Sequence, residues 1–235
     1  FKPRVSKRFT REEFETPAGR KRAWRALMLG DHGLLRKLYD NTHEVSEGKL
    51  WRSYQPSPAT LKKWKERGVR TVINLRGDAP SGFYFLEEEA CRELGLEFVS
   101  FRVFSRDAPS KEILHGARKL FEDITYPAMM HCKSGADRAG LMAMLYLFYQ
   151  EGASLDEAME QLSLRYGHVK QGKTGVIDYA FQQYIDYAQE HGKSLSSCED
   201  FFHWVDNVYD PKVTKDSFLG SWWGNFLTEK VLRRE

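Results

Sequence analysis

The sequence predicts an α/β fold, in which a central sheet is flanked by helices and extra helices lie at both termini. From Lys49 onward, short apolar runs alternate with segments whose apolar residues recur at helical intervals, as expected for strands and helices packed in layers. The apolar segment Ala128–His131 follows Pro127 and is short enough for a buried strand. The chain has 235 residues, 41% hydrophobic and 29% charged, so it can bury one sizeable core.

The elements can be assigned in chain order. Residues 1–19 lack a period and hold two prolines, which indicates an arm, whereas residues 20–39 carry apolar side chains at helical intervals, which indicates a helix. Strands are predicted at 49–53, 70–75, 96–101 and 128–131, and helices at 58–67, 83–94, 109–124 and 141–149. Ser154 and Glu157 form a capping-box pattern before another helix, and amphipathic helices are predicted at 176–188 and 218–231. We therefore expect a basic arm and helix at 1–44, a core at 45–192 and a C-terminal helical extension at 193–235.

One segment carries residues suited to a chemical step: HCKSGADRAG, His131–Gly140, between a predicted strand and a predicted helix. A loop that surrounds a phosphate must turn several backbone N–H groups inward, which Gly135 permits. The following helix directs its positive end at the same point, which favours both a phosphate dianion and a thiolate at Cys132. Arg138 can fold back and bind two phosphate oxygens. The structural alternative, a buried cysteine beside a glycine turn, would not require this arginine.

The segment resembles the signature loop of the protein tyrosine phosphatase superfamily, which has His-Cys, five residues and Arg. His131, Cys132, Gly135, Arg138 and Gly140 fall on motif positions. The resemblance covers about residues 45–190 and implies a dual-specificity-phosphatase-like sheet. It also implies that Cys132 attacks phosphorus to form a phosphocysteine, that Arg138 binds the phosphoryl group, and that His131 orders the loop and keeps the thiol ionised. No metal or other cofactor is implied. The phrases WRSYQPSP and TVINLRG look like those of bacterial members of the group.

The resemblance further implies a general acid, an Asp on a loop upstream that protonates the leaving oxygen. Asp107 is the natural candidate, because it follows the strand at 96–101 and precedes a helix. The structural alternative is that Asp107 only caps that helix. Asp137, inside the loop, is the main rival, since some inositide phosphatases with Asp-Arg at this point use that residue. Asp78 is a third candidate.

Ala139 departs from the family pattern, which usually places Ser or Thr directly after the arginine. That hydroxyl helps the thiolate leave in the second step. Its replacement by Ala139 predicts slow breakdown of the phosphoenzyme, unless Ser134 or a water takes over. The alternative from another functional class is a catalytically weak module that binds phosphorylated ligands.

The residues Lys133, Ser134, Gly135, Ala136 and Asp137 are expected to line the phosphate site. Lys133 is also found in tensin-like lipid phosphatases, whose loop begins His-Cys-Lys, although many protein phosphatases carry Lys here too. Lys173, in the run from His168 to Gly175, is a candidate second anion contact, and the structural alternative is a turn in which Thr174 caps the next helix.

The leading substrate hypothesis is a phosphoprotein, with phosphotyrosine or dual specificity, and the alternative is a phosphorylated lipid or inositol phosphate. Residues 1–40 hold eleven Lys or Arg and five Asp or Glu, a net charge of +6, and the last predicted helix is rich in aromatic residues. Both features suit peripheral contact with an anionic membrane. The competing explanations are a solvated arm and a helix that docks on its own domain, and we expect no nucleic-acid partner.

Cysteine usage indicates a reducing compartment. The three cysteines, Cys91, Cys132 and Cys198, are odd in number and sparse, unlike a secreted disulfide framework. No apolar run is long enough to cross a bilayer. We therefore expect a cytoplasmic protein, and we expect Cys91 to form no protective disulfide with Cys132 unless the geometry brings the two together.

Overall fold

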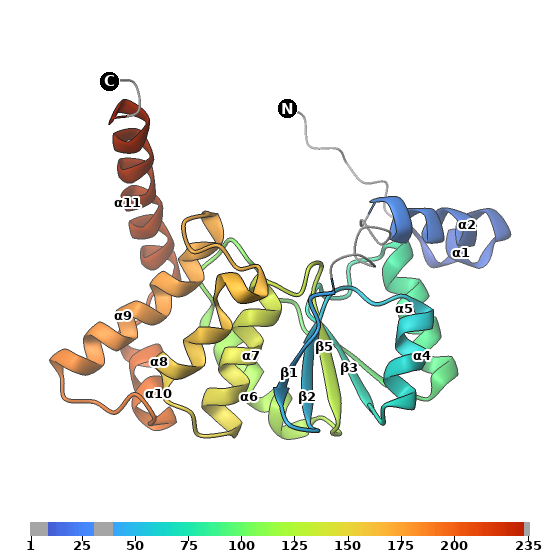
Figure 1. Cartoon of the computed structure of the whole chain (residues 1–235), viewed down its shortest axis with the longest axis horizontal. Coiled ribbons are helices and arrows are strands. Elements are labelled where there is room, and N and C mark those ends of the chain that lie inside the picture. Colours follow the sequence, from blue (N-terminus) through green and yellow to red (C-terminus); the bar gives the residue numbers. More distant parts are fainter. Residues whose placement is uncertain (1–8, 31–39, 233–235) are drawn as a thin grey trace. The chain divides into compact units, whose positions relative to one another are not determined.

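The computed structural model describes residues 9–30 and 40–232, and within the last helix the side chains up to residue 221. The chain divides into two compact units (Figure 1). The first comprises Phe1–Arg102 and Ile124–Ala139, and the second comprises Val103–Asp123 and Gly140–Glu235. Each unit is described by itself.

The first unit contains a five-stranded sheet in the order β1-β2-β5-β3-β4. The strands are β1 (His43–Ser46), β2 (Leu50–Ser53), β3 (Thr71–Asn74), β4 (Glu97–Ser100) and β5 (Ala128–His131). All neighbours are parallel except β1 and β2, which form a hairpin. The four predicted strands are confirmed. The strand β1 was not predicted, because its sequence HEVS holds a single apolar residue and is stabilised by pairing with β2.

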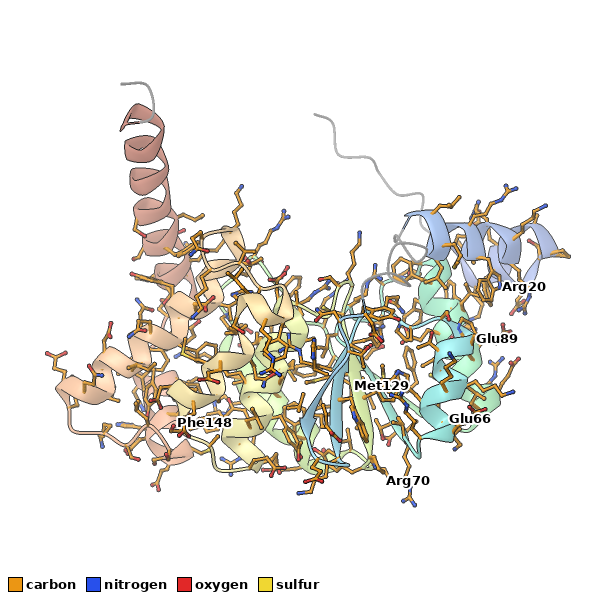
Figure 2. The ribbon with its side chains drawn as sticks, in the orientation of Figure 1. Arg20, Glu66, Arg70, Glu89, Met129 and Phe148 are labelled. Atoms are coloured by element: carbon orange, nitrogen blue, oxygen red, sulfur yellow. The ribbon has the colours of Figure 1, made fainter. Side chains whose placement is uncertain are left out.

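Two helices pack on this sheet, α4 (Pro58–Glu66) and α5 (Gly82–Leu94), as predicted (Figure 1). Ser57 and Ser81 cap their N-termini with side-chain hydrogen bonds, and Gly95 ends α5 in the left-handed conformation. The layers share an apolar core to which Met129 of the central strand contributes (Figure 2). Its buried members are Leu61, Trp64, Val69, Val72, Ala90, Cys91, Leu96 and Met129.

The N-terminal segment corrects the sequence prediction. Helices α1 (Arg11–Glu15) and α2 (Pro17–Arg25) occupy part of the predicted arm, because Thr10 and Thr16 cap them and Pro17 starts the second. A π-helical turn, η1 (Ala26–Gly30), follows. The rest of the predicted helix at 20–39 lies outside the described residues. The segment packs on α5 through Phe9, Phe14, Ala23, Leu27, Phe85 and Leu86.

Several basic side chains of this segment form ion pairs within the first unit. Arg20 binds Glu89 with two hydrogen bonds of 2.6 and 2.9 Å (Figure 2), and Arg11 pairs with Glu88. Two of the five Lys or Arg residues in 9–30 are therefore matched by carboxylates of α5.

The described part of the second unit is helical, as predicted. Its longer helices are α6 (Lys111–Asp123), α7 (Asp137–Gln150, which starts in the first unit), α9 (Val176–Glu190), α10 (Cys198–Asn207) and α11 (Pro211–Leu232). Shorter turns are α8 (Leu155–Ala158), η2 (Met159–Gln161), η3 (Leu164–Tyr166) and η4 (Lys173–Gly175). An aromatic core holds the helices together. Phe148 of α7 (Figure 2) belongs to it, together with Phe181, Tyr184, Phe201 and Trp204. In the described residues, none of the helices is both long and apolar enough to cross a membrane.

Candidate active site

The loop predicted to carry the chemistry lies between β5 and α7 in the first unit. In the register of the sheet, His131 at the end of β5 lies opposite Ser53 of β2 and Asn74 of β3. The carboxyl ends of these parallel strands therefore meet at one edge, where ligands of α/β proteins commonly bind. Cys132 follows directly and is almost fully buried, and its N–H donates to Ser53 O at 3.4 Å.

The carbonyl groups of the loop are held by side chains from other strands and connections. Asn41 Nδ2 donates to Ser134 O at 2.9 Å, and Arg52 Nη2 donates to the carbonyls of Gly135 and Ala136 at 2.8 Å each. In a planar trans peptide the N–H points away from the C=O. The N–H groups of residues 135, 136 and 137, which share these three peptide units, therefore point to the opposite side of the loop. An anion placed there could accept a hydrogen bond from each of them.

Gly135 is required by the shape of this loop. Its φ of +76° lies in the left-handed region, as the sequence predicted. A Cβ atom at this position would lie 2.9 Å from Asn41 O and 3.0 Å from the carbonyl carbon of Ser53. The backbone of neighbouring segments approaches so closely that no side chain fits without a shift.

The first turn of α7 directly follows this loop. The helix begins at Asp137, so its N-terminal end and positive partial charge face the loop. Arg138 is half-buried in this first turn, and Ala139 beside it is fully buried. Lys133 is half-buried and Ser134 is exposed. The loop thus combines a buried thiol, directed backbone amides, a helix N-terminus and a guanidinium.

His131 and Glu87 form a buried ion pair behind the loop. Sequence analysis missed Glu87, because it lies in the run of three glutamates of α5 that looks like a solvated helix face. It also missed Arg52 and Asn41, although Arg52 is a charged residue in an apolar strand, which is a signal of a specific buried role.

Asp107 and Lys173 belong to the second unit, so the geometry of the first unit leaves their predicted roles untested. Asp107 forms an ion pair with Lys215 of α11. It does not cap the next helix, because α6 starts at Lys111 and the Ser110 hydroxyl accepts the Ile113 N–H at 3.3 Å. That structural alternative is therefore wrong.

The other candidates can also be placed. Lys173 is exposed in η4, and the proposed cap by Thr174 is wrong, since Gly175 is the N-cap of α9 and Thr174 Oγ1 donates to Val169 O at 3.2 Å. Asp78 is exposed in the connection after β3. The predicted phosphate-site residues from 131 to 138 therefore lie together, and Asp137 is the carboxylate within that loop.

Cys91 is a buried free thiol of α5. Burial, with a smaller contribution from the negative charge of Glu87, holds the pKa of the Cys91 thiol well above its usual range. A thiol that stays protonated is a poor nucleophile. Cys91 is not bonded to Cys132, which is also free.

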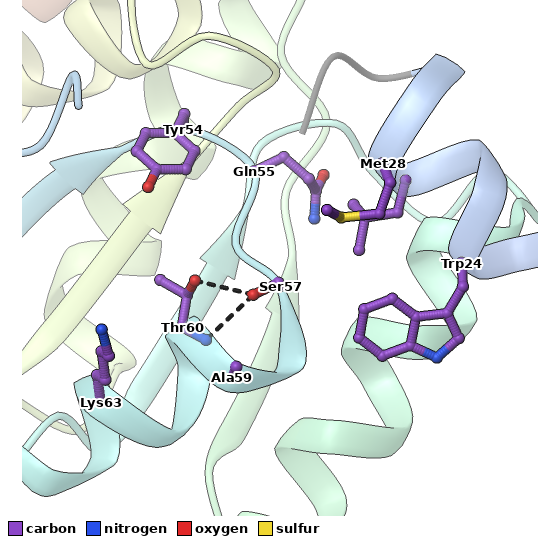
Figure 3. A pocket seen from close by; sticks show the side chains of 9 residues that line it. Trp24, Met28, Tyr54, Gln55, Ser57, Ala59, Thr60 and Lys63 are labelled. Atoms are coloured by element: carbon purple, nitrogen blue, oxygen red, sulfur yellow. Dashed lines mark hydrogen bonds between the residues drawn. The ribbon is translucent and has the colours of Figure 1, made fainter. Parts of the chain in front are cut away.

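A pocket of about 480 Å³ is lined by the N-terminal segment, the connection after β2 and the start of α4 (Figure 3). Its wall includes Gln55, whose N–H donates to Lys133 O at 3.4 Å. In Figure 3, Trp24 and Met28 form one side, and Thr60 and Lys63 lie on the other. The other lining residues are Leu27, Tyr54, Ser57 and Ala59.

Comparison with known proteins identifies the class. Residues 34–179 match the family described as DSP-PTPase phosphatase fused to NAD+ kinase. The chain therefore belongs to this family of dual-specificity-like phosphatases, within the protein tyrosine phosphatase superfamily. The predicted fold class is confirmed.

Matches to solved phosphatases have low sequence identity and TM-scores below 0.5. P. aeruginosa TpbA is 19% identical, with a TM-score of 0.49 over 72% of this chain and 92% of that one. A structure of PTPMT1 in complex with PI(5)P is 18% identical, with a TM-score of 0.44 over 55% of this chain and 86% of that one. Human DUSP28 is 16% identical, with a TM-score of 0.39 over 52% of this chain and 78% of that one. A search of curated proteins found no match.

Proposed function

We propose that the chain is a cysteine-dependent phosphatase that hydrolyses phosphate monoesters through a phosphocysteine at Cys132. The observation that carries this proposal is the orientation of the loop: Asn41 and Arg52 hold its carbonyls, so that consecutive amides turn to the opposite side. The amides and the N-terminus of α7 supply positive potential for a phosphate dianion. Membership of a phosphatase family supports the same reaction class.

In the first step, the Cys132 thiolate attacks phosphorus and the bond between phosphorus and the ester oxygen breaks. Arg138 binds two non-bridging oxygens, and the loop amides bind the charge that develops on the phosphoryl group. The leaving oxygen takes a proton from a general acid, a role that we assign to Asp107, with Asp137 as the rival. In the second step, water attacks phosphorus and gives a proton to the carboxylate that acted as acid, the P–S bond breaks to restore the Cys132 thiolate, and inorganic phosphate leaves.

We favour a phosphoprotein substrate, with phosphotyrosine or dual specificity. The alternative substrate is a phosphorylated lipid or inositol phosphate, and one argument for it is the positive charge of the N-terminal segment. Arg11, Arg20 and Arg22 of that segment each pair with a glutamate, which leaves less positive charge for an anionic membrane surface. Lys133 beside the nucleophile would suit either substrate.

The test is a substrate panel with a chemical trap. Phosphopeptides, phosphoinositides, lipid head groups and inositol phosphates are compared by kcat/KM, and the reaction is quenched in acid for mapping by mass spectrometry. We expect a phosphoryl group on Cys132 and the highest kcat/KM with a phosphopeptide. Turnover without any adduct on Cys132 would contradict the mechanism, and a preference for a lipid or inositol phosphate would replace the substrate assignment. Tight binding with no turnover on any substrate would favour the phospho-ligand binding module.

A further inference from the structure

A buried chain of polar side chains leads to the residue before the nucleophile. Arg76 Nη1 donates to Gln55 Oε1 at 2.8 Å, and Gln55 Nε2 donates to Glu87 Oε2 at 2.7 Å. The other oxygen of that carboxylate, Glu87 Oε1, lies against His131 Nε2 as an ion pair. Glu87 and His131 are 1% and 0% exposed, so water does not screen the contact.

The hydrogen bonds between these side chains run in one direction, from Arg76 through Gln55 to Glu87. Because the oxygen of Gln55 faces the guanidinium of Arg76, its amide nitrogen must face Glu87, which therefore acts as an acceptor. A buried carboxylate with one neutral donor still lacks a matching charge, and burying it unpaired is costly. His131 is the group that faces its second oxygen.

Both nitrogens of the His131 ring face oxygen acceptors. Nε2 meets the Glu87 carboxylate, and Nδ1 lies 3.4 Å from the carbonyl of Cys132. A neutral imidazole carries one N–H and no charge, whereas an imidazolium carries an N–H on each nitrogen and a positive charge that matches the Glu87 carboxylate. The contact with Glu87 is an ion pair only when the ring is doubly protonated.

We propose that Glu87 is a positioning residue that keeps His131 doubly protonated and fixes its ring, so that a positive charge lies next to the nucleophilic cysteine. This inference rests on the proposed function of Cys132. The ring lies between the carboxylate at Nε2 and the Cys132 carbonyl at Nδ1, so the imidazolium is the nearer charge to the loop. A nearby positive charge favours a thiolate.

Other charged and titratable groups lie on the elements around the pair, among them Lys133, Asp137 and Arg138 of the loop itself. Arg52 of β2 holds the loop carbonyls, Arg76 ends the polar chain after β3, and Cys91 on α5 is the neighbouring thiol, whose pKa Glu87 helps to raise. Arg52 and Arg76 carry permanent positive charges, because a guanidinium is not deprotonated in proteins.

The experiment measures the rate at which iodoacetamide alkylates Cys132 as a function of pH, in the full chain, with peptide mapping by mass spectrometry to separate Cys198. We expect Glu87→Gln to move the midpoint of this profile upward by about one pH unit, because a neutral amide no longer requires an imidazolium. The matched control is Glu88→Gln, since Glu88 is the next residue of α5 and pairs with Arg11 at the surface. Its midpoint should equal that of the wild type.

An unchanged midpoint in a folded Glu87→Gln variant would overturn the inference, and so would a wild-type midpoint near the value of about 8.5 for a free thiol. A second measurement needs no variant: ¹⁵N spectra of labelled histidines should show His131 doubly protonated at neutral pH, and a neutral tautomer would overturn the inference. Both measurements are independent of turnover. If the wild type hydrolyses no substrate, the proposed function fails while these results still decide the role of Glu87.

Discussion

Replacing Gly135 with alanine tests whether the shape of the loop is required for function. The substitution has two separable effects. First, alanine at a φ of +76° costs about 1–2 kcal/mol of stability, because its Cβ crowds the carbonyl in the left-handed region. Second, the new Cβ would lie 2.9 Å from Asn41 O and 3.0 Å from the carbonyl carbon of Ser53. Both are backbone atoms, so the loop must shift, at a further cost of about 1–3 kcal/mol.

Gly95 provides the matched control. It has a φ of +61°, and a Cβ placed there meets nothing within 4 Å. Gly95→Ala should therefore show the backbone cost of about 1–2 kcal/mol alone. The additional destabilisation in Gly135→Ala is then the steric effect of the close approach.

Urea unfolding gives the two stability changes, and kcat/KM for p-nitrophenyl phosphate gives the functional effect. We expect Gly135→Ala to lower kcat/KM by about 100-fold, the typical effect of a displacement near 1 Å in a catalytic group, and Gly95→Ala to leave it unchanged. Equal stability losses in the two variants, together with a normal kcat/KM in Gly135→Ala, would refute the inference that the close backbone approach requires glycine at position 135.

Four further substitutions test individual residues. Cys132→Ser should abolish turnover while phosphate-ligand binding stays measurable, because an alcohol in this loop stays protonated. Arg138→Lys should lower kcat/KM by about 100-fold or more, since an ammonium cannot make the two-point contact. Asp107→Asn should slow alkyl phosphates by about 100-fold or more and affect p-nitrophenyl phosphate less, because a nitrophenolate leaves without a proton. Ala139→Ser should speed the slow phase after a burst of released alcohol by about tenfold, because a hydroxyl near the departing thiolate is worth about 1–3 kcal/mol.

Each result can also contradict its premise. Full activity in Cys132→Ser would remove the covalent mechanism, and a normal rate in Arg138→Lys would mean that Arg138 binds elsewhere. If Asp137→Asn shows the leaving-group contrast and Asp107→Asn does not, the acid is the loop carboxylate. Absence of a burst, with no gain in Ala139→Ser, would mean that another group already supports the second step.

The parallel strands and the helices between them could be predicted because each one buries an apolar pattern of its own. The strand at 128–131 and the helix at 83–94 are examples, and both lie within a residue of their predicted bounds. By contrast, β1 gains its structure from pairing with β2, and α1 from the capping box of Thr10 and Glu13. Neither element depends on a periodic pattern of apolar residues, so neither could be predicted from such a pattern.

The loop residues could be predicted from the motif because nucleophile, glycine and arginine are adjacent in sequence. The groups that orient them are distant: Asn41 is 93 residues from Ser134, and Arg52 is 83 residues from Gly135. Their side chains become informative only once the order of β1, β2 and β5 is known. The buried role of Glu87 could not be predicted because its sequence neighbours resemble it. Glu88 and Glu89 form surface ion pairs, and nothing in the sequence distinguishes Glu87 from them.

The signature loop does not by itself determine how its amides are directed. The direction of the amides in residues 134–137 depends on where the preceding carbonyls find donors, and here those donors are a buried guanidinium and an amide from outside the motif. A chain could keep His131, Cys132 and Arg138 and still lose its anion site if Arg52 were replaced by an apolar residue. Two carbonyls would then lack a charged donor, which is worth about 1.5–3 kcal/mol for each bond. The peptide units would then no longer be held with their N–H groups toward the proposed phosphate site. On the proposed mechanism, phosphate binding by this chain depends on Arg52 as well as on the motif.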